Sequence, residues 1–306
     1  MNVFLTGATG FIGGYILREL ARAGHSVRCL VRGKPRQLDV ESMDVEQVEG
    51  NVIDPATLRG TMTGCEAVIH LVGIIEEKPS KGMTFTRVHY EGTKAVVNEA
   101  LESGISRFIH MSANGARSDG VSGYQTSKWK AEEYVRSAGF DAWTIFRPST
   151  IFGDPGTEHP EFATRLARTL VKPFPVLPVF GDGTFEMQPI SAEETASAFV
   201  QALTVEAARG TSYCTAGQER MSFNEVLDRI TDAVGHARKK KVPQPISLIR
   251  PIVHTMGRTG LLPITPDQFE MLVEGNTCDS TALYRDFDLT FKPFRPENLS
   301  YLKRRS

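Results

Sequence analysis

The sequence lacks the patterns that mark a metal site or a disulfide framework. Its four cysteines form neither a CxxC pair nor the Cys/His spacing of a zinc site, and they are Cys29, Cys65, Cys214 and Cys278. The seven histidines form no HExxH motif or comparable ligand cluster. We therefore expect no bound metal, and we interpret the cysteines as buried thiols in a reducing compartment.

The sequence also lacks a long apolar run and an excess of charge of either sign. No stretch of 18 apolar residues is present, and the apolar run NVFLTG follows Met1 directly. We therefore expect neither a transmembrane helix nor a signal or transit peptide. A formal net charge of -1 and a pI near 6.7 create no overall field that would attract nucleic acid or a membrane. The expectation is a soluble, cytoplasmic protein whose partner is a small molecule or another protein.

Short β-branched apolar runs alternate with helical patterns in the first half of the chain. This alternation predicts repeated βαβ units and a parallel sheet. The six expected strands cover residues 2–6, 26–31, 45–49, 67–72, 107–112 and 142–146. The clearest expected helices cover residues 11–23, 85–103 and 124–138. The first of them ends before Gly24, which we interpret as its C-terminal cap. The sequence thus predicts a doubly wound α/β fold.

The regular alternation ends after RPSTIFGDPG. Pro/Gly-rich segments such as VKPFPVLPVFGDG then separate shorter helices, which indicates a second lobe. We expect residues 190–203 to return to the sheet as a covering helix, with TSYCTA as a further strand. The predicted organisation is a first domain of residues 1–152, with 188–216 returning to it, and a small mixed C-terminal substrate lobe of 153–187 and 217–306.

Three glycines, Gly7, Gly10 and Gly13, lie between the first expected strand and the first expected helix. Glycine there permits a tight turn, a close approach of the backbone to a pyrophosphate, and helix-on-strand packing. The helix N-terminus adds free amides and the positive end of the helix dipole. The spacing is G-x-x-G-x-x-G, and the strand-turn-helix context predicts a dinucleotide site in a Rossmann-type fold.

The end of the second expected strand indicates which dinucleotide is bound. An NAD enzyme usually carries an acidic residue there, on the ribose hydroxyls. Between residues 26 and 38 the chain carries no carboxylate but has Arg28, Arg32, Lys34 and Arg36. Arginine can hold a 2'-phosphate through two parallel hydrogen bonds, so the sequence favours NADP(H), with Arg32 at the strand end as the main contact.

Tyr124 and Lys128 lie four residues apart in GYQTSKWK, on one face of an expected helix. A second pair with the same spacing, Tyr90 and Lys94, lies inside the preceding helix. The first pair opens its helix beside the C-terminal strand ends, where doubly wound folds bind ligands, so we interpret the second pair as incidental. A tyrosine near an ammonium group and an oxidised nicotinamide would have its pKa lowered toward neutrality for proton transfer.

The motifs TGATGFIG, HLVG, YQTSK and RPSTIFG, in this order, resemble the short-chain dehydrogenase/reductase superfamily in its extended or atypical form, which includes NAD-dependent epimerase/dehydratase-like proteins. The segment PVFGDGTFEMQPISAEETASAFVQAL is similar to the one that crosses the substrate cleft in that superfamily. The segment LPITPDQFEMLVEGNTCD (262–279) most resembles proteins related to the NADPH-binding accessory subunit of respiratory complex I.

The resemblance implies a set of cofactor-binding residues that runs from the phosphates and the 2'-phosphate through adenine and the ribose to the nicotinamide. In that order the set is Gly7, Thr9, Gly10, Phe11, Ile12, Gly13, Arg32, Asn51, Val52, Leu71, Val72, Gly73, Tyr124, Lys128, Pro148 and Ile151.

Two positions depart from the pattern of the superfamily. His89 stands where extended members usually carry Asn, and Ala113 stands at the position of the catalytic Ser, with Ser112 one residue early. A missing hydroxyl there removes a donor to a substrate carbonyl, a loss that can lower turnover about 100-fold or more. The catalytic candidates are therefore Tyr124, Lys128 and Ser112.

Two functions follow from these observations. The leading hypothesis is an NADP(H)-binding, atypical reductase-like protein whose cofactor serves structure or assembly, associated with respiratory complex I and peripheral to the membrane through that partner. The alternative is an active NADP-dependent oxidoreductase or sugar-nucleotide epimerase/dehydratase that acts on a small carbonyl or sugar-nucleotide substrate with Tyr124 and Lys128.

Two further segments carry weaker signals. The cationic run ARKKK (237–241) lacks nearby aromatic residues, which argues against nucleic acid, and we interpret it as a solvated helix cap. Residues 246–263 place Ile246, Ile249, Ile252, Val253 and Met256 at helical spacing. Such a helix either docks on a membrane-embedded partner or packs inward, and the inward interpretation is favoured.

Overall fold

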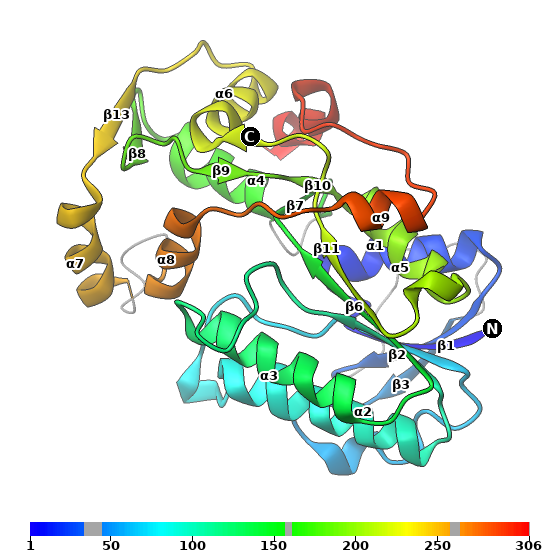
Figure 1. Ribbon diagram of the computed structural model, residues 1–306. Coiled ribbons are helices and arrows are strands. Elements are labelled where there is room, and N and C mark those ends of the chain that lie inside the picture. Colours follow the sequence, from blue (N-terminus) through cyan, green and yellow to red (C-terminus); the bar gives the residue numbers. More distant parts are fainter. Residues whose placement is uncertain (34–44, 157–160, 258–263, 306) are drawn as a thin grey trace. The chain divides into compact units, whose positions relative to one another are not determined.

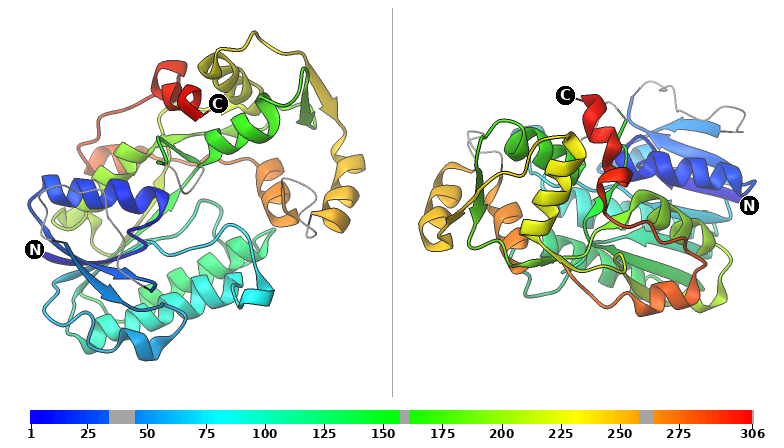
Figure 2. Two further views of the ribbon diagram at one scale, coloured as in Figure 1. Left: turned by 180° about the vertical axis from the view of Figure 1, so that it is seen from behind. Right: turned by 90° about the horizontal axis from the view of Figure 1, so that it is seen from above.

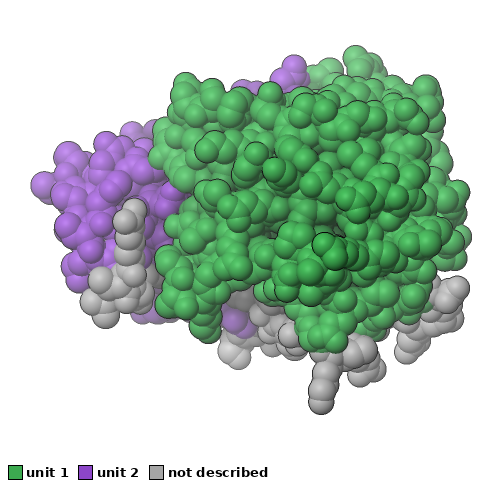
Figure 3. Space-filling model, turned by 90° about the horizontal axis from the view of Figure 1, so that it is seen from below, with its two compact units in different colours: residues 1–148, 193–215, 280–289 green, residues 149–192, 216–279, 290–306 purple. Residues whose placement is uncertain are grey.

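The computed structural model describes residues 1–33, 45–156, 161–257 and 264–305. The chain forms two compact units. The first comprises Met1–Pro148, Glu193–Thr215 and Ser280–Leu289, and the second comprises Ser149–Ala192, Ala216–Asp279 and Thr290–Ser306 (Figure 3).

A seven-stranded sheet in which every strand pairing is parallel forms the centre of the first unit. Its strands are β1 (Asn2–Thr6), β2 (Ser26–Val31), β3 (Val45–Glu49), β4 (Ala67–His70), β5 (Arg107–Met111), β6 (Ala142–Pro148) and β11 (Thr211–Thr215). Their spatial order is β11-β6-β5-β4-β1-β2-β3, so the winding direction reverses between β1 and β4. The predicted doubly wound α/β fold is confirmed, and ligands of such folds bind at the carboxyl ends of the strands beside this reversal.

Helices cover both faces of this sheet. The helices are α1 (Phe11–Arg22), α2 (Gly92–Glu102), α3 (Gly123–Ser137), α5 (Ala192–Gln201) and α9 (Thr281–Asp286). Figures 1 and 2 show α2 and α3 side by side on one face, with α1 on the other. Phe4 and Phe108 of the sheet pack with Val96 of α2 and Val135 of α3 in one buried apolar cluster. A π-helical turn, Thr86–Glu91, precedes α2, so the predicted helix over 85–103 is not regular along its length.

The segment 280–289 belongs to the first unit, whereas the sequence assigned it to the C-terminal lobe. Side chains explain the difference. The Tyr213 hydroxyl of β11 donates to Asp286 Oδ2 over 2.8 Å, and the Tyr284 hydroxyl donates to Glu194 Oε1 of α5 over 2.8 Å. Contacts between residues so distant in the chain leave no local sequence signal.

The second unit is built from short elements. They are β7 (Ile151–Phe152), α4 (Phe162–Leu166), a π-helical turn (Ala167–Val171), β8 (Leu177–Phe180), β9 (Glu186–Met187), β10 (Ile190–Ser191), β12 (Met221–Ser222), α6 (Phe223–Val234), β13 (Lys241–Gln244), α7 (Ile246–Met256), α8 (Pro266–Glu274) and a 3-10 helix (Pro296–Arg305). The strands form three two-stranded sheets, β10-β7, β12-β9 and β13-β8. Phe152, Val226, Phe294 and Leu302 belong to its buried core.

The cysteines divide into two groups. Cys29 and Cys65 are free thiols, whereas Cys214 and Cys278 are disulfide-bonded. The prediction of four thiols is therefore wrong for Cys214 and Cys278, whose spacing in the sequence shows no disulfide pattern. Within the described ranges, no helix combines the length and the apolar character needed to cross a bilayer.

Candidate functional site

A glycine turn joins β1 to α1 at the carboxyl edge of the sheet. Gly7 has φ of +81°, a conformation that favours glycine. The Gly10 N–H donates to the Gly7 carbonyl oxygen over 2.9 Å and closes the turn, with Thr9 inside it. Helix α1 then begins at Phe11, and its first turn carries no acidic residue. The first amides of a helix have no partner within it, so this terminus suits an anion.

The glycines of this turn leave no room for side chains. A Cβ atom at Gly13 would lie 2.1 Å from the Gly7 carbonyl oxygen, and one at Gly7 would lie 3.2 Å from Cβ of Leu71. Such close packing of helix against turn is what a pyrophosphate cradle requires. Gly7, Thr9, Gly10 and the first residues of α1 thus fit the phosphates of a dinucleotide.

Arg32 follows β2 directly and its side chain is exposed. Lys34 and Arg36 lie outside the described residues. Arg28 is engaged elsewhere, because its Nε donates to Glu46 Oε2 of β3 over 2.5 Å and its Nη1 donates to the Thr63 carbonyl over 2.7 Å. Of the two described arginines, Arg32 is therefore the one available for a ligand.

The residues after β3 and β4 line the same edge. The Asn51 N–H donates to Thr57 Oγ1 over 2.9 Å, and Val52 beside it is buried. The Leu71 N–H donates to the Thr6 carbonyl over 3.3 Å, which ties the loop after β4 to the end of β1. A Cβ atom at Gly73 would lie 3.1 Å from Nζ of Lys128.

The structure therefore brings together several of the predicted residues. Gly7 lies against Leu71 and Val72, and Gly73 lies against Lys128. The loop after β4 is their common neighbour.

Tyr124 and Lys128 lie in the first two turns of α3, which is capped by the Ser122 hydroxyl. Lys128 is buried, and its Nζ donates to the Met111 carbonyl at the end of β5 over 2.9 Å. Burial lowers the pKa of Lys128 to about 8, against the opposing charge of Glu132. The other pair, Tyr90 and Lys94, contacts Tyr134 of α3.

The Tyr124 ring packs edge-on against His89, with 5.1 Å between ring centroids, and against Phe85. Burial raises the pKa of Tyr124 to about 12. The sequence argument expected a lowered pKa from Lys128 and an oxidised nicotinamide. In the protein alone, desolvation of the phenolate moves the pKa the other way.

His89 links the loop after β4 to α3, a role that its position in the sequence did not reveal. Its Nδ1 lies 2.9 Å from Ser127 Oγ, and the Ser127 hydroxyl donates to the Tyr124 carbonyl over 2.9 Å. Nε2 lies 3.0 Å from the Ile74 backbone nitrogen and 3.1 Å from its carbonyl oxygen. Burial lowers the pKa of His89 to about 2, so the ring is uncharged at neutral pH.

The residues at the carboxyl ends of β5 and β6 offer no exposed hydroxyl. Ser112 is buried, and its Oγ has no hydrogen-bond partner in the described part of the chain. Ala113 is also buried. The Asn114 N–H donates to the Pro148 carbonyl over 2.8 Å, which fixes Pro148 beside the end of β5. Ile151 lies in the second unit, where it pairs with Ile190.

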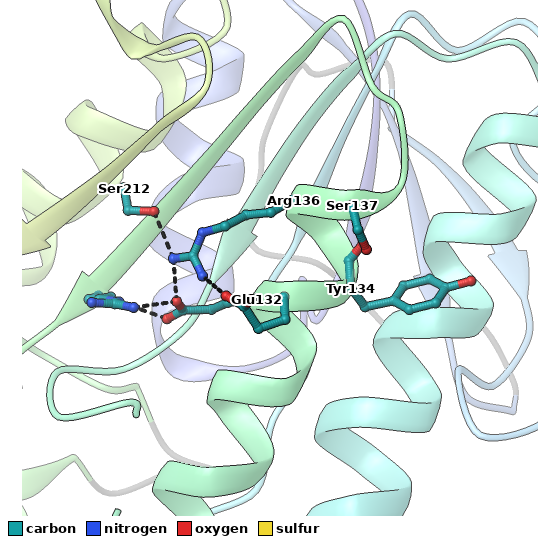
Figure 4. Close-up of polar contacts among 7 residues, drawn as sticks. Glu132, Tyr134, Arg136, Ser137 and Ser212 are labelled. Atoms are coloured by element: carbon teal, nitrogen blue, oxygen red, sulfur yellow. Dashed lines mark hydrogen bonds and ion pairs between the residues drawn. The ribbon is translucent and has the colours of Figure 1, made fainter. Parts of the chain in front are cut away.

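An ion-pair network that the sequence did not suggest anchors α3 to the sheet. Glu132 is fully buried, and its carboxylate accepts from Arg147 Nε of β6 over 2.8 Å and from Arg136 Nη2 over 2.6 Å. Figure 4 shows the Arg136 guanidinium between Glu132 and Ser212 of β11. The network holds the helix that carries Tyr124 and Lys128 against two strands.

The lowered pKa of Lys128 predicts a pH dependence of stability. The unfolded chain binds this proton up to the ordinary value of 10.5 and the folded chain only up to about 8. Stability from this group therefore rises as the pH rises through that window. At about 1.4 kcal/mol per pKa unit, the wild type should gain roughly 2 kcal/mol over Lys128→Met between pH 8 and pH 10.

Urea denaturation of the two proteins across that range measures the difference. Comparison with the variant removes other groups, such as Cys29, whose raised pKa acts in the opposite direction in both proteins. A difference in unfolding free energy that stays constant with pH would contradict a buried Lys128 with a lowered pKa.

The chain is similar in sequence to a known family and to several known proteins. Residues 7–170 match a family described as NAD(P)H-binding. A ceramide reductase of Caulobacter vibrioides is 36% identical over 198 residues, which are 65% of this chain and 59% of that protein. A mitochondrial NADH dehydrogenase [ubiquinone] 1 alpha subcomplex subunit 9 of Arabidopsis thaliana is 31% identical over 250 residues, which are 79% of this chain and 60% of that protein. The chain thus spans about 60% of the length of these two relatives.

Among solved structures, the UDP-glucose 4-epimerase of Thermotoga maritima superposes with a TM-score of 0.74 at 16% identity, covering 100% of this chain and 99% of that chain. At this identity the likeness concerns the fold, and it agrees with the Rossmann-type topology described above.

Proposed function

Because this chain belongs to the NAD(P)H-binding family, we propose that it is an NADP(H)-binding, atypical short-chain dehydrogenase/reductase-like protein whose cofactor serves structure or assembly. Catalysis is weak or absent in this proposal. The observation that carries it is the buried methyl group of Ala113 where the superfamily has a catalytic hydroxyl, with the Ser112 hydroxyl enclosed in the core. The donor that would polarise a substrate carbonyl is missing.

The first unit would hold the cofactor with its own residues. The turn from Gly7 to Ile12 would bind the phosphates, and Arg32 the 2'-phosphate of NADP(H). Lys128 and Tyr124 would hydrogen-bond the nicotinamide ribose. When bound, a nicotinamide supplies or accepts a hydride, whereas holding its ribose requires only the donors that α3 presents.

The 2'-phosphate contact predicts a change of cofactor preference in Arg32→Ala. Loss of a charge-assisted hydrogen bond costs about 1.5–3 kcal/mol, so NADPH affinity should fall roughly 10- to 100-fold while NADH affinity stays the same. Arg22→Ala removes another exposed arginine, at the far end of α1, and serves as the control. Calorimetric titration of both cofactors measures the ratio, and an equal loss for NADH and NADPH would argue against the 2'-phosphate contact.

The similarity to the Arabidopsis subunit supports a role in assembly. In this proposal the chain associates with respiratory complex I and lies at the membrane through that partner. Native-gel migration of the untagged protein with the large respiratory complex is the expected result, and migration as a small soluble species would count against it.

The second candidate function is an active NADP-dependent oxidoreductase or sugar-nucleotide epimerase/dehydratase. The proximity of the buried Lys128 to Gly73 at the carboxyl edge of the sheet favours it, as does the similarity to a ceramide reductase. In this reading Tyr124 transfers the proton, and the positive charge of Lys128 lowers the pKa of the phenol once the cofactor is present.

Tyr124→Phe separates the two functions. A structural cofactor predicts that NADPH affinity changes less than about ten-fold and that no turnover is lost, because one ribose hydrogen bond is worth about 1 kcal/mol. An enzyme predicts that turnover of a carbonyl substrate falls by roughly two to four orders of magnitude.

Tyr90→Phe is the matched control, since Tyr90 has the same spacing to a lysine but packs against Tyr134. NADPH oxidation that vanishes in Tyr124→Phe and persists in Tyr90→Phe would overturn the structural proposal.

A further inference from the structure

Exposed apolar side chains are concentrated on the second unit. Among the described residues, six of the ten large apolar side chains with the highest exposure lie in two segments of this unit. They are Phe174 (44% exposed), Val176 (42%), Val242 (36%), Leu248 (64%), Ile252 (45%) and Met256 (40%). Such a concentration on one unit marks an interaction surface.

Helix α7 presents half of this surface as a stripe. Leu248, Ile252 and Met256 follow one another at intervals of four residues and are all exposed, whereas Val253 on another side of the helix is buried. Arg250 of α7 forms an ion pair with Glu270 of α8, with 3.0 Å between Nε and Oε1. The inward packing favoured from the sequence is therefore wrong for Ile252 and Met256, whereas Val253 is buried and Ile246 and Ile249 are half-buried. Residues 258–263 of that predicted segment lie outside the described residues.

The other exposed residues adjoin β13, the strand that leads into α7. Strand β8 pairs with β13 in parallel, with Leu177 opposite Lys241. Lys239 Nζ donates to the Phe174 carbonyl over 2.8 Å. The exposed residues 174–176 therefore lie beside residues 239–242, and Figures 1 and 2 show β13 continuing from this pairing into α7.

The two segments that carry these side chains contain cations but no acidic residues. Residues 162–180 and 236–257 contain no aspartate or glutamate. Their cations are Arg165, Arg168, Lys172, Arg238, Lys239, Lys240, Lys241 and Arg250. Three of them are paired with acids of other segments, namely Lys241 with Asp228, Arg238 with Asp232, and Arg250 with Glu270.

The net charge of these two segments differs from that of the chain, which is -1 overall. Lys240 is exposed between the exposed Val242 and the exposed residues 174–176. Burial and then the charge of the nearby Arg168 lower the pKa of Lys172. A surface of aliphatic and aromatic side chains beside exposed cations such as Arg168 and Lys240 is complementary to an anionic lipid headgroup layer, where the apolar groups enter the acyl boundary and the cations meet phosphates.

We propose that this face of the second unit, formed by residues 172–176 and 238–256, binds the surface of an anionic lipid bilayer. Binding is peripheral: the side chains of Phe174, Leu248 and Ile252 enter the interface, while Lys240 and Lys172 contact lipid phosphates. The inference stands on residues that the dinucleotide site does not use, so it holds whether or not the bound cofactor reacts.

Flotation of the full chain with vesicles tests the proposal. The expected result is binding to phosphatidylcholine vesicles that contain one third phosphatidylglycerol, and little binding to phosphatidylcholine alone. High salt should weaken the binding, because exposed charges are screened beyond about 10 Å at 0.1 M ionic strength. A wild-type chain that floats with neither vesicle overturns the proposal, and a protein partner on this face then becomes the explanation. Equal binding to both vesicles overturns the assigned role of the cations.

Two double variants locate the face. Leu248→Gln with Ile252→Gln should reduce binding at least ten-fold without lowering the melting temperature, because both side chains are exposed. Leu101→Gln with Val121→Gln removes exposed apolar groups of the first unit and should leave binding unchanged. Equal losses in the two double variants overturn the assignment to this face. Lys240→Glu should lower binding to the anionic vesicles, and unchanged binding in this variant overturns the contact between Lys240 and lipid phosphate.

Discussion

Gly13→Ala is expected to lower the affinity for NADPH about 5- to 150-fold, while Gly14→Ala leaves it unchanged. The added methyl group at Gly13 would lie 2.1 Å from the Gly7 carbonyl oxygen and 2.9 Å from Cα of Ala8. Both neighbours are backbone atoms of the turn, so relief of the clash must move the turn away from α1. The phosphate contacts depend on the position of these amides, and an overpacked site of this kind costs about 1–3 kcal/mol or more.

The same substitution one residue later has no such consequence. A Cβ atom at Gly14 meets only the end of the Arg18 side chain, at 3.6 Å from Nη1. Alanine is also the better helix former by about 1 kcal/mol, so Gly14→Ala should keep or raise stability. Isothermal titration with NADPH, together with thermal unfolding, compares the two variants. Wild-type affinity in Gly13→Ala would refute the assignment of this turn to the phosphates.

If Gly13→Ala does not fold, Gly10→Ala provides the same test with a milder contact. Its Cβ atom would lie 3.3 Å from the Gly7 carbonyl oxygen. The expected loss of affinity is then smaller, on the order of ten-fold, with the fold retained.

Glu132→Ala is expected to lower the free energy of unfolding by about 3–5 kcal/mol, and Glu133→Ala by less than about 1 kcal/mol. The two residues are neighbours on α3 and both bind Arg136. Glu132 is fully buried and also holds Arg147, whereas the side chain of Glu133 is 50% exposed. Removal of the buried carboxylate takes the ion-pair partner of Arg147 away and leaves Arg136 with Glu133 alone, which costs far more than loss of a solvated pair.

Urea denaturation of the two variants measures this difference. The cofactor affinity of Glu132→Ala should fall as well, because the anchor of α3 also fixes Lys128 one turn away. Similar small losses of stability in the two variants would show that the network contributes no more than a surface pair.

Much of the first unit follows from local patterns. Strands β1, β2 and β3 have the predicted bounds, and β6 extends two residues beyond its predicted end at 146. β-branched runs of this length specify strands because each residue contributes to a buried pleated surface. The glycine turn is equally local, since only glycine tolerates the φ of Gly7 and the approach of Gly13.

Contacts between distant residues could not be predicted in this way. In the sequence, nothing distinguishes Glu132 from the other helical glutamates. The structure shows that β6 places Arg147 beside it. In the sequence, His89 is only a departure from a family pattern. The structure shows that its ring contacts Ile74 and Ser127. The pairing of Tyr284 with Glu194 likewise joins segments that are 90 residues apart in the chain.

The sequence by itself determined the order of strands and helices, the turn between β1 and α1, and the family, because these depend on residues that are close in the chain. Only the tertiary structure decided which charges are buried, which direction the pKa of Tyr124 takes in the protein alone, and which apolar side chains of α7 are exposed. These properties depend on desolvation and on partners supplied by other elements. A periodic pattern identifies one face of a helix but not what covers that face.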